Sequence, residues 1–240
     1  MITRLPSPAD LFRAAADEFV RVGRDAITAR GRFTVALSGG STPRALYSLL
    51  ARDHADFPWD KTFLFFGDER HVPPDHADSN YRMVQESLLS RISIPAQNVF
   101  RVGAENADAA LAAQGYEQKV QAFFSLSPRQ FPRFDLVLLG LGPDGHTASL
   151  FPESDGLKEQ SRLAIANWIA KFNAYRITFT FPVLNHASSV IFLVSGADKA
   201  DVVREILEGH RVPPYPAQTV QPVDMLTWML DDAAASKLSR

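Results

Sequence analysis

Short apolar runs without alternation recur along the chain and predict strands that are buried on both faces. They cover residues 33–37, 61–66, 136–139 and 189–194. Runs of this kind are typical of parallel sheets, whose two faces are both covered by helices. Residues 176–181, RITFTF, alternate polar and apolar side chains instead, which predicts a half-buried strand.

Apolar residues at helical spacing predict amphipathic helices between these strands. The first follows Ser7-Pro8 and runs to about Arg30, where Gly31 ends it. Further helices are expected from about Pro43 onward and over residues 79–89, 104–126, 200–208 and 225–235. Residues 163–171 are compatible with either a strand or a helix. Strands that alternate with helices indicate an α/β fold with a mainly parallel sheet.

Composition narrows the class of protein. The chain has 240 residues, 46% of them hydrophobic and 22% charged, which is enough for a substantial core. One domain, residues 1–240, is the default, and two small domains are the alternative. The net charge of −2 gives no basic field that would attract nucleic acid or an anionic membrane, so neither is an expected partner.

The absence of cysteine excludes disulfides and thiolate nucleophiles, and it favours a reducing compartment. The N-terminal segment holds charges and prolines where a signal peptide needs an apolar region. No apolar run reaches the roughly 18 residues needed to span a bilayer. A soluble, cytoplasmic protein is therefore expected.

The strand at 33–37 runs into a glycine loop, Ser38-Gly39-Gly40-Ser41-Thr42-Pro43, that opens a helix. We expect Ser41 or Thr42 to cap this helix. Backbone N–H groups at the positive end of a helix dipole, beside glycines that carry no Cβ, suit a phosphate. The loop lacks the P-loop lysine and the third glycine of the dinucleotide fingerprint. A tight structural turn is the alternative interpretation.

Charged residues follow two other strands. Gly67-Asp68-Glu69-Arg70 comes after 61–66 and makes Asp68 and Arg70 candidates for contacts to a ligand. A solvated cluster of ion pairs is the alternative. After 189–194, Lys199 lies at a strand-to-helix junction, a position that opposes the helix dipole unless an anion is near.

The strand at 136–139 ends in a sharp turn, Pro143-Asp144-Gly145, which leaves His146 just past its carboxyl end. His146 is the one residue of this turn that can take a proton at neutral pH. A surface turn in which Asp144 only caps the next segment is the alternative. Because the carboxyl ends of parallel strands share one edge of a sheet, these four loops together predict a pocket for a small phosphorylated ligand.

Three stretches of the sequence, in this order and at these spacings, resemble the glucosamine-6-phosphate isomerase/6-phosphogluconolactonase family: SGGSTPRALYSLL, FFGDERHVPPDHADSNYRMVQESLL and FDLVLLGLGPDGHTASLFP. The resemblance extends over nearly the whole chain and is closest to the lactonase branch. It implies a doubly wound α/β fold with helices on both faces of the sheet. It also implies hydrolysis of the phosphorylated sugar lactone 6-phosphoglucono-δ-lactone to 6-phosphogluconate in the pentose phosphate pathway, without an obligatory cofactor. A monomer or weak homo-oligomer is expected.

Under this interpretation, His146 acts as the general base on a water molecule and Asp144 orients its imidazole. Ser149 as a nucleophile is the weaker alternative. The expected contacts to phosphate and sugar are Gly39, Gly40, Ser41, Thr42, Asp68, Arg70, Lys199 and Arg176. The family often has prolines between the residues that correspond to Lys171 and Arg176, and this chain has none there, which leaves the roles of both residues open.

Other functions remain as alternatives. The isomerase branch carries an acidic residue five positions after the histidine, where this chain has Phe151, which cannot relay a proton. A sugar-phosphate-sensing domain like that of certain bacterial repressors is disfavoured because no basic helix suits DNA reading. His71 and His76 fit no standard metal spacing, so no metal site is expected.

Overall fold

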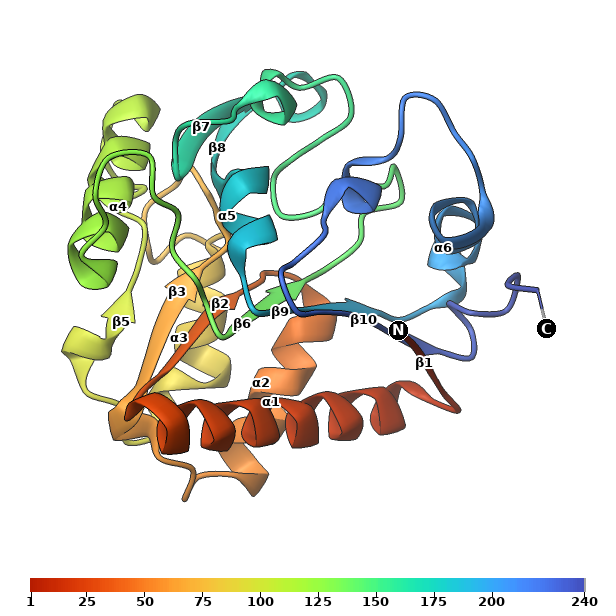
Figure 1. Ribbon diagram of the computed structural model, residues 1–240, viewed down its shortest axis with the longest axis horizontal. Coiled ribbons are helices and arrows are strands. Elements are labelled where there is room, and N and C mark those ends of the chain that lie inside the picture. The colour runs from red at the N-terminus through yellow and green to blue at the C-terminus, as the bar shows by residue number, and fades with distance from the viewer. Residues whose placement is uncertain (240) are drawn as a thin grey trace.

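The computed structural model describes residues 1–239, which form two sheets (Figure 1). The larger sheet has seven strands in the order β1-β10-β9-β6-β2-β3-β5, and each neighbouring pair is parallel. These strands are β1 (Ile2–Leu5), β2 (Phe33–Leu37), β3 (Thr62–Phe66), β5 (Val99–Phe100), β6 (Leu136–Leu139), β9 (Ser189–Val194) and β10 (Met225–Asp231). The smaller sheet is antiparallel, in the order β4 (Asp68–Arg70), β8 (Ala174–Phe179) and β7 (Ala164–Ile169).

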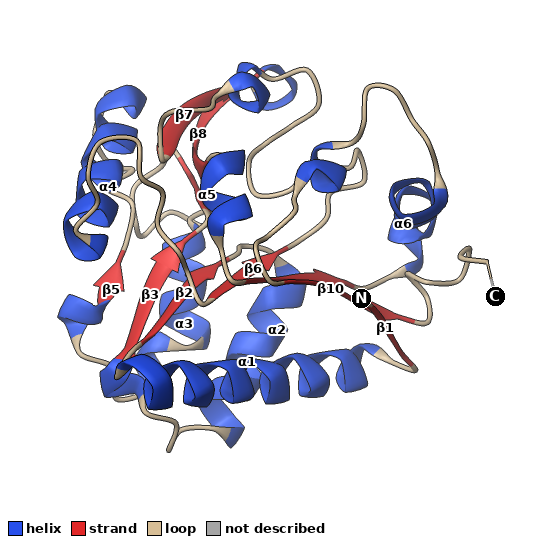
Figure 2. Cartoon of the chain, viewed as in Figure 1, coloured by secondary structure: helices blue, strands red, loops and turns tan. Residues whose placement is uncertain are grey.

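Helices cover both faces of the larger sheet (Figures 1 and 2). One face carries α1 (Pro8–Arg30), α2 (Ser41–Asp53) and α3 (Asn80–Ser87). The other carries the smaller sheet together with α4 (Ala109–Phe124), α5 (Phe181–His186) and α6 (Ala200–Glu208). This arrangement confirms the predicted α/β class with a mainly parallel sheet and helices on both faces.

The α1 helix forms as its sequence predicts. The Ser7 hydroxyl accepts a hydrogen bond from the backbone N–H of Asp10 at 3.2 Å, and Pro8 occupies the first turn. Gly31 ends the helix in the left-handed region at φ +73°. The buried face of α1 includes Phe19, whose ring packs edge-on against Phe33 of β2, with centroids 5.2 Å apart.

The predicted helix over 225–235 is wrong, because Met225–Asp231 form β10 in the larger sheet. Strands β1 and β9 pair with its two edges. Trp228 stacks on Phe192 of β9, with ring centroids 3.9 Å apart and planes at 3°. A short apolar run that is buried on both faces has no periodicity to distinguish a strand from a helix.

Several element boundaries also differ from the predictions. The segment Asp68–Arg70, expected as a loop, forms strand β4, and residues 164–169 form β7, which settles the ambiguous segment as a strand. Strand β8 ends at Phe179, and Phe181 begins α5 instead of extending the strand. The sequence patterns did not predict the short elements β1, β5 and α5.

The α4 helix begins at Ala109, five residues later than predicted, because Asp108 caps it. The Asp108 carboxylate accepts hydrogen bonds from the backbone N–H groups of Ala110 and Leu111, at 2.7 and 3.2 Å. Leu111, predicted on the apolar side, is 53% exposed. Tyr116 and Val120 are buried as predicted.

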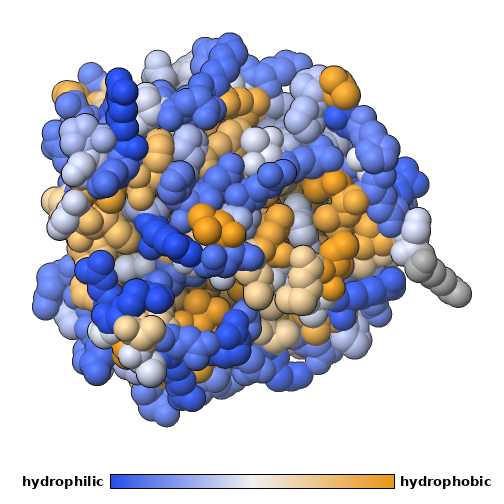
Figure 3. Space-filling view, viewed as in Figure 1, coloured by the Kyte–Doolittle hydropathy of each residue, from blue (hydrophilic) through white to orange (hydrophobic). Residues whose placement is uncertain are grey.

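Most of the surface on the face shown in Figure 3 is hydrophilic, and hydrophobic residues emerge in several areas near its middle. No helix within residues 1–239 combines the length and the apolar character that a bilayer crossing requires.

Candidate active site

The four predicted loops meet at one cavity of about 280 Å³ at the carboxyl ends of β2, β3, β6 and β9. Each loop contributes lining residues, among them Gly40, Asp68, His146 and Lys199. Gly39, Ser41, Thr42 and Arg70 also line the cavity. The structure thus brings together residues that are separated by up to 160 positions in sequence, from Gly39 to Lys199.

Backbone hydrogen bonds fix the turn after β6, and a glycine of this turn packs against the imidazole of His146. The N–H of Gly142 donates to the carbonyl of His146 at 2.9 Å, and the N–H of Gly145 donates to the carbonyl of Gly142 at 3.0 Å. A Cβ atom on Gly142 would lie 1.9 Å from Nδ1 of His146, so a side chain at position 142 would displace the ring. Gly145 has φ +74°, which L side chains rarely adopt.

His146 and Asp144 form a close pair. Nδ1 of His146 lies 2.5 Å from Oδ1 of Asp144, and Nζ of Lys171 lies 3.3 Å from Oδ2 of the same carboxylate. An ionised carboxylate only accepts hydrogen bonds, so Nδ1 carries the proton and Nε2 presents its lone pair. Within the described chain, Nε2 has no hydrogen-bond partner. Every buried side-chain nitrogen there does have a partner, so Nε2 is not buried and is accessible.

The pKa values of His146 and Asp144 are both below their ordinary values, as a neutral general base beside a carboxylate requires. Burial lowers the pKa of His146 below its ordinary value, and it outweighs the opposing effect of the Asp144 carboxylate. Burial acts to raise the pKa of Asp144, but the hydrogen bond and charge of His146, with Lys171, leave that pKa below its ordinary value. At neutral pH the pair therefore combines a neutral imidazole with an ionised carboxylate.

The glycine loop presents the N-terminus of α2 to the cavity. The predicted cap, Ser41 or Thr42, is wrong: α2 begins at Ser41 itself, and the capping residue is Gly40, at φ +105°. Gly40 offers no side-chain acceptor, and the first N–H groups of a helix have no partner inside it. The helix start is therefore open to an anion.

Asp68 lines the cavity and belongs to a buried polar network. It is 8% exposed and accepts a hydrogen bond from the Ser149 hydroxyl at 2.6 Å and from Nδ2 of Asn80 at 3.3 Å. Ser149 is 2% exposed and is not among the residues that line the cavity, which argues against its use as a nucleophile. Asn80 lines the cavity, and the sequence patterns did not single it out. Gly39 makes room for it, because a Cβ there would lie 1.9 Å from Asn80 Oδ1.

Glu69 and Arg70 have different surroundings. Glu69 is 3% exposed, and its carboxylate accepts hydrogen bonds from the backbone N–H groups of Arg70, Asn80 and Tyr81, at 2.7 to 2.8 Å. Burial raises the pKa of Glu69. Glu69 therefore fixes the start of α3, and the interpretation as a solvated ion-pair cluster does not hold for it. Arg70 lines the cavity, and its Nη1 donates to the carbonyl of Asp78 at 2.5 Å.

Lys199 reaches the cavity from the loop between β9 and α6. The loop turns at Gly196, which has φ +104°, and its N–H donates to the buried carboxylate of Asp231 at 3.1 Å. The Ser195 hydroxyl also donates to that carboxylate. Asp231 lies at the end of β10, and its role was missed because this segment was predicted as a helix.

Arg176 does not line the cavity. It lies opposite Arg70 in the register of the antiparallel strands β8 and β4. Its guanidinium lies 5.3 Å from the centre of the Phe172 ring. Burial, and then the charge of Arg70, lower the pKa of Arg176. The turn after β7 instead brings Lys171 to Asp144.

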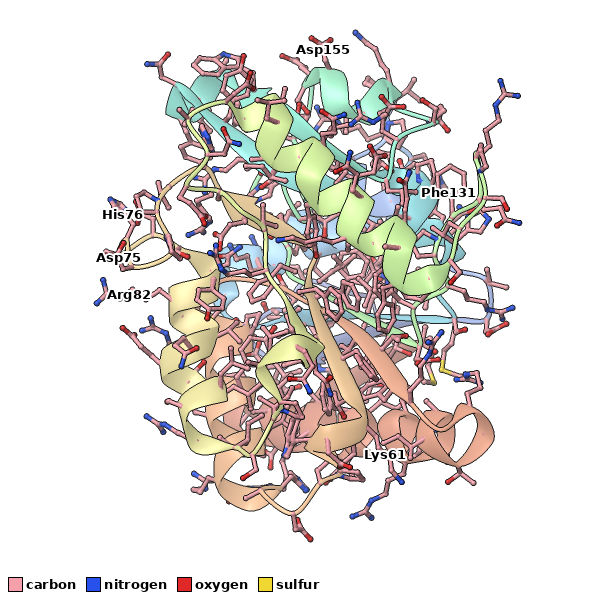
Figure 4. All side chains as sticks on the ribbon, turned by 90° about the vertical axis from the view of Figure 1, so that its left-hand side faces the viewer. Lys61, Asp75, His76, Arg82, Phe131 and Asp155 are labelled. Atoms are coloured by element: carbon pink, nitrogen blue, oxygen red, sulfur yellow. The ribbon has the colours of Figure 1, made fainter. Side chains whose placement is uncertain are left out.

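Asp75 and His76 lie at the outer side of a surface loop, near Arg82 (Figure 4). Nη1 of Arg82 donates to the carbonyl of Asp75 at 3.0 Å. Nowhere in residues 1–239 do three His, Asp or Glu side chains come together in a way that could hold a metal ion.

Comparisons with known proteins point to one family. The family described as glucosamine-6-phosphate isomerases/6-phosphogluconolactonase matches residues 6–228. A 6-phosphogluconolactonase from Nostoc sp. is 44% identical over 237 residues, which cover 98% of this chain and 97% of the relative. One from Synechocystis sp. is 46% identical over 215 residues, covering 89% and 88%. The solved structure of 6-phosphogluconolactonase from Trypanosoma cruzi has a TM-score of 0.90 and 32% identity, covering 100% of this chain and 97% of that one.

Proposed function

Because the chain belongs to the glucosamine-6-phosphate isomerase/6-phosphogluconolactonase family, we propose that it hydrolyses 6-phosphoglucono-δ-lactone to 6-phosphogluconate in the oxidative pentose phosphate pathway. The observation that carries the proposal is the pairing of His146 with Asp144 on a cavity that also receives the glycine loop and Lys199. A δ-lactone is an activated ester, so a positioned base and a water molecule suffice to open it.

In the proposed reaction, Nε2 of neutral His146 accepts a proton from the attacking water. The water oxygen bonds to C1 of the lactone, and the bond between C1 and the ring oxygen breaks as His146 returns the proton to that oxygen. One water is added, and the open-chain acid is the only product. Asp144 holds the Nδ1 proton and stabilises the imidazolium between the two transfers, as the carboxylate of a catalytic triad does.

The glycine loop and Lys199 bind the phosphate in this proposal. Backbone N–H groups of Gly39 and Gly40, and the N–H and hydroxyl groups of Ser41 and Thr42, donate to its oxygens at the positive end of α2. Lys199 supplies the countercharge. Its side chain is only 21% exposed, and within the described chain its one ion-pair partner is Asp198, at 3.2 Å. A bound phosphate also removes the conflict between Lys199 and the dipole of α6.

Arg70 and Asp68 contact the rest of the substrate in this proposal. Arg70 lines the cavity and donates to the phosphate or to the carboxylate of the product. Asp68 accepts hydrogen bonds from sugar hydroxyls while it keeps its bond to Ser149. Arg176 is not among the lining residues, and in this proposal it adds positive charge beside Arg70, its partner in the β4–β8 ladder.

Phe151 disfavours isomerase chemistry. Its ring lies against the imidazole of His146, with centroids 3.8 Å apart, where the other branch of the family carries an acid. A phenyl ring has no group that can accept or donate a proton, so it cannot open the sugar ring or transfer protons between its carbon atoms.

The decisive experiment assays the purified protein on freshly prepared 6-phosphogluconolactone and, in parallel, on glucosamine-6-phosphate. We expect acid release from the lactone well above its spontaneous hydrolysis, and no ammonia or ketose from the amino sugar. Turnover of the amino sugar alone would assign the protein to the isomerase branch. Binding of either sugar phosphate without turnover would support a sensing domain instead.

A further inference from the structure

The ring of Phe151 lies flat against the imidazole of His146. The ring centroids are 3.8 Å apart and the planes differ by 20°. Phe151 is only 7% exposed, and Phe172, from the turn after β7, meets it edge-on with centroids 5.7 Å apart. The described chain holds a second contact between a phenylalanine and a histidine, Phe131 on His186, but its centroids are 5.0 Å apart and its planes are tilted by 38°.

Asp144, Gly142 and Phe151 each restrain the imidazole of His146 at a different place. Asp144 bonds one ring atom, Nδ1, and this hydrogen bond restrains rotation of the ring about its bond to Cβ. Gly142 packs along the Nδ1 side of the ring. The phenyl ring stacks along a face of the imidazole, so together with these two contacts it sets the direction in which Nε2 points.

Phe151 also keeps water away from that face. Two carboxylates act on His146, Asp144 beside it and Asp68 from β4, and both favour the imidazolium form. The ammonium group of Lys171 opposes them. Burial opposes them more strongly and holds the pKa of His146 below its ordinary value. The apolar ring of Phe151 supplies part of that burial.

We propose that Phe151 is a positioning residue for the lactonase reaction, whose ring, together with Asp144 and Gly142, fixes the plane of the His146 imidazole and shields one of its faces from water. The inference rests on the base role of His146 proposed above. It explains why the position that carries an acid in the isomerase branch holds an aromatic ring here. A flat ring makes a stacked contact that a branched or flexible apolar side chain of similar volume cannot make.

The test compares Phe151→Leu with the unmodified protein in two measurements. The first follows the Cε1–H signal of His146 by proton NMR as a function of pH, assigned by its loss in His146→Gln. The second measures kcat, KM and the pH dependence of kcat/KM. We expect the pKa of His146 to rise as water reaches the ring, and the acid limb of kcat/KM to move to higher pH. We expect kcat to fall about tenfold, because a misdirected base loses part of its contribution, while KM changes less than threefold.

Two further variants separate stacking from general loss of packing. Phe151→Tyr keeps the ring and should retain both the titration and kcat. Phe131→Leu removes the ring of the other phenylalanine–histidine pair and should leave the His146 titration unchanged; Phe131 is labelled in Figure 4. If Phe151→Leu does not fold, Phe151→Met is measured by the same criteria, because it fills similar volume without a flat face.

An unchanged titration and an unchanged kcat in Phe151→Leu would overturn the inference. A loss of kcat that Phe151→Tyr does not restore would overturn it as well. The proposed function fails separately: if His146→Gln keeps the lactonase activity, or if the unmodified protein has none, the base role is wrong whatever the titration shows.

Discussion

The two walls of the cavity are built in different ways. The base wall, residues 142–151, surrounds one titrating side chain with a carboxylate, a ring face and a glycine. The phosphate wall consists of the loops 38–43 and 195–199 and presents backbone N–H groups, hydroxyls and Lys199. A proton-transfer group needs its pKa and its direction set by neighbours, whereas an anion needs only fixed donors and charge. Changes in the base wall should therefore alter kcat and its pH dependence, and changes in the phosphate wall should alter KM.

Removal of the base should have the largest effect. We expect His146→Ala to lower kcat by about 10² to 10⁴-fold, because general bases usually contribute that much, and to leave KM nearly unchanged. Initial rates on the fresh lactone, corrected for its spontaneous hydrolysis, give both constants. A kcat within threefold of the unmodified protein would place the base elsewhere and remove the distinction between the two walls.

Asp144→Asn should lower kcat by about 10²-fold or more, because an amide can donate to Nδ1 and so move the imidazole proton to Nε2. The Asp144 carboxylate raises the pKa of His146, so its loss lowers that pKa further. The reaction needs neutral imidazole and is lost as the pH falls through this pKa. The acid limb of kcat/KM should therefore move to lower pH.

The matched control for this variant is Asp155→Asn. Asp155 lies a short distance along the same segment of the chain, and its side chain is 94% exposed. It should change neither kcat nor the position of the acid limb. An equal effect of both variants would indicate a general electrostatic change instead of a specific role for Asp144.

These residues could be predicted because their signals are local. A glycine or a Pro-Asp-Gly turn at the end of a buried strand is visible in a few adjacent letters, and parallel strands bring such loops to one edge. The sequence therefore predicted the strands β2, β6 and β9 and the loops that line the cavity.

The supporting residues could not be predicted because their partners are distant in sequence. Asp231 bonds the loop of Lys199 from 35 residues away, and Ser149 bonds Asp68 from 81 residues away. The role of Asp231 was also missed because the apolar run of β10 has no strand periodicity, so the segment was predicted as a helix. Glu69 resembled a solvated charge because its hydrogen-bond donors, the backbone N–H groups at the start of α3, come close to it only after folding.

Lys199→Ala tests the phosphate wall. A lost hydrogen bond between charged groups costs about 1.5 to 3 kcal/mol, so KM for the phosphorylated lactone should rise by about tenfold or more, with kcat within a few-fold. The preference for this substrate over unphosphorylated gluconolactone should fall by the same factor. Lys158→Ala is the control, because the Lys158 side chain is 81% exposed and does not line the cavity. An unchanged substrate preference would exclude Lys199 as the countercharge.

The smallest effect is expected from Asp231→Asn, behind the phosphate wall. Asp231 is 1% exposed and accepts hydrogen bonds from Ser195, Gly196 and Ala234. Asparagine keeps one acceptor oxygen, so the loop should loosen without unfolding. We expect a loss of about 1 to 2 kcal/mol in the free energy of unfolding, measured by urea denaturation, and a two- to threefold rise in KM. The acid limb of kcat/KM should stay where it is, because no contact links Asp231 to His146 in the described chain. A shift of that limb like the one in Asp144→Asn would mean that the two walls are coupled and that the base is not set by its own neighbours alone.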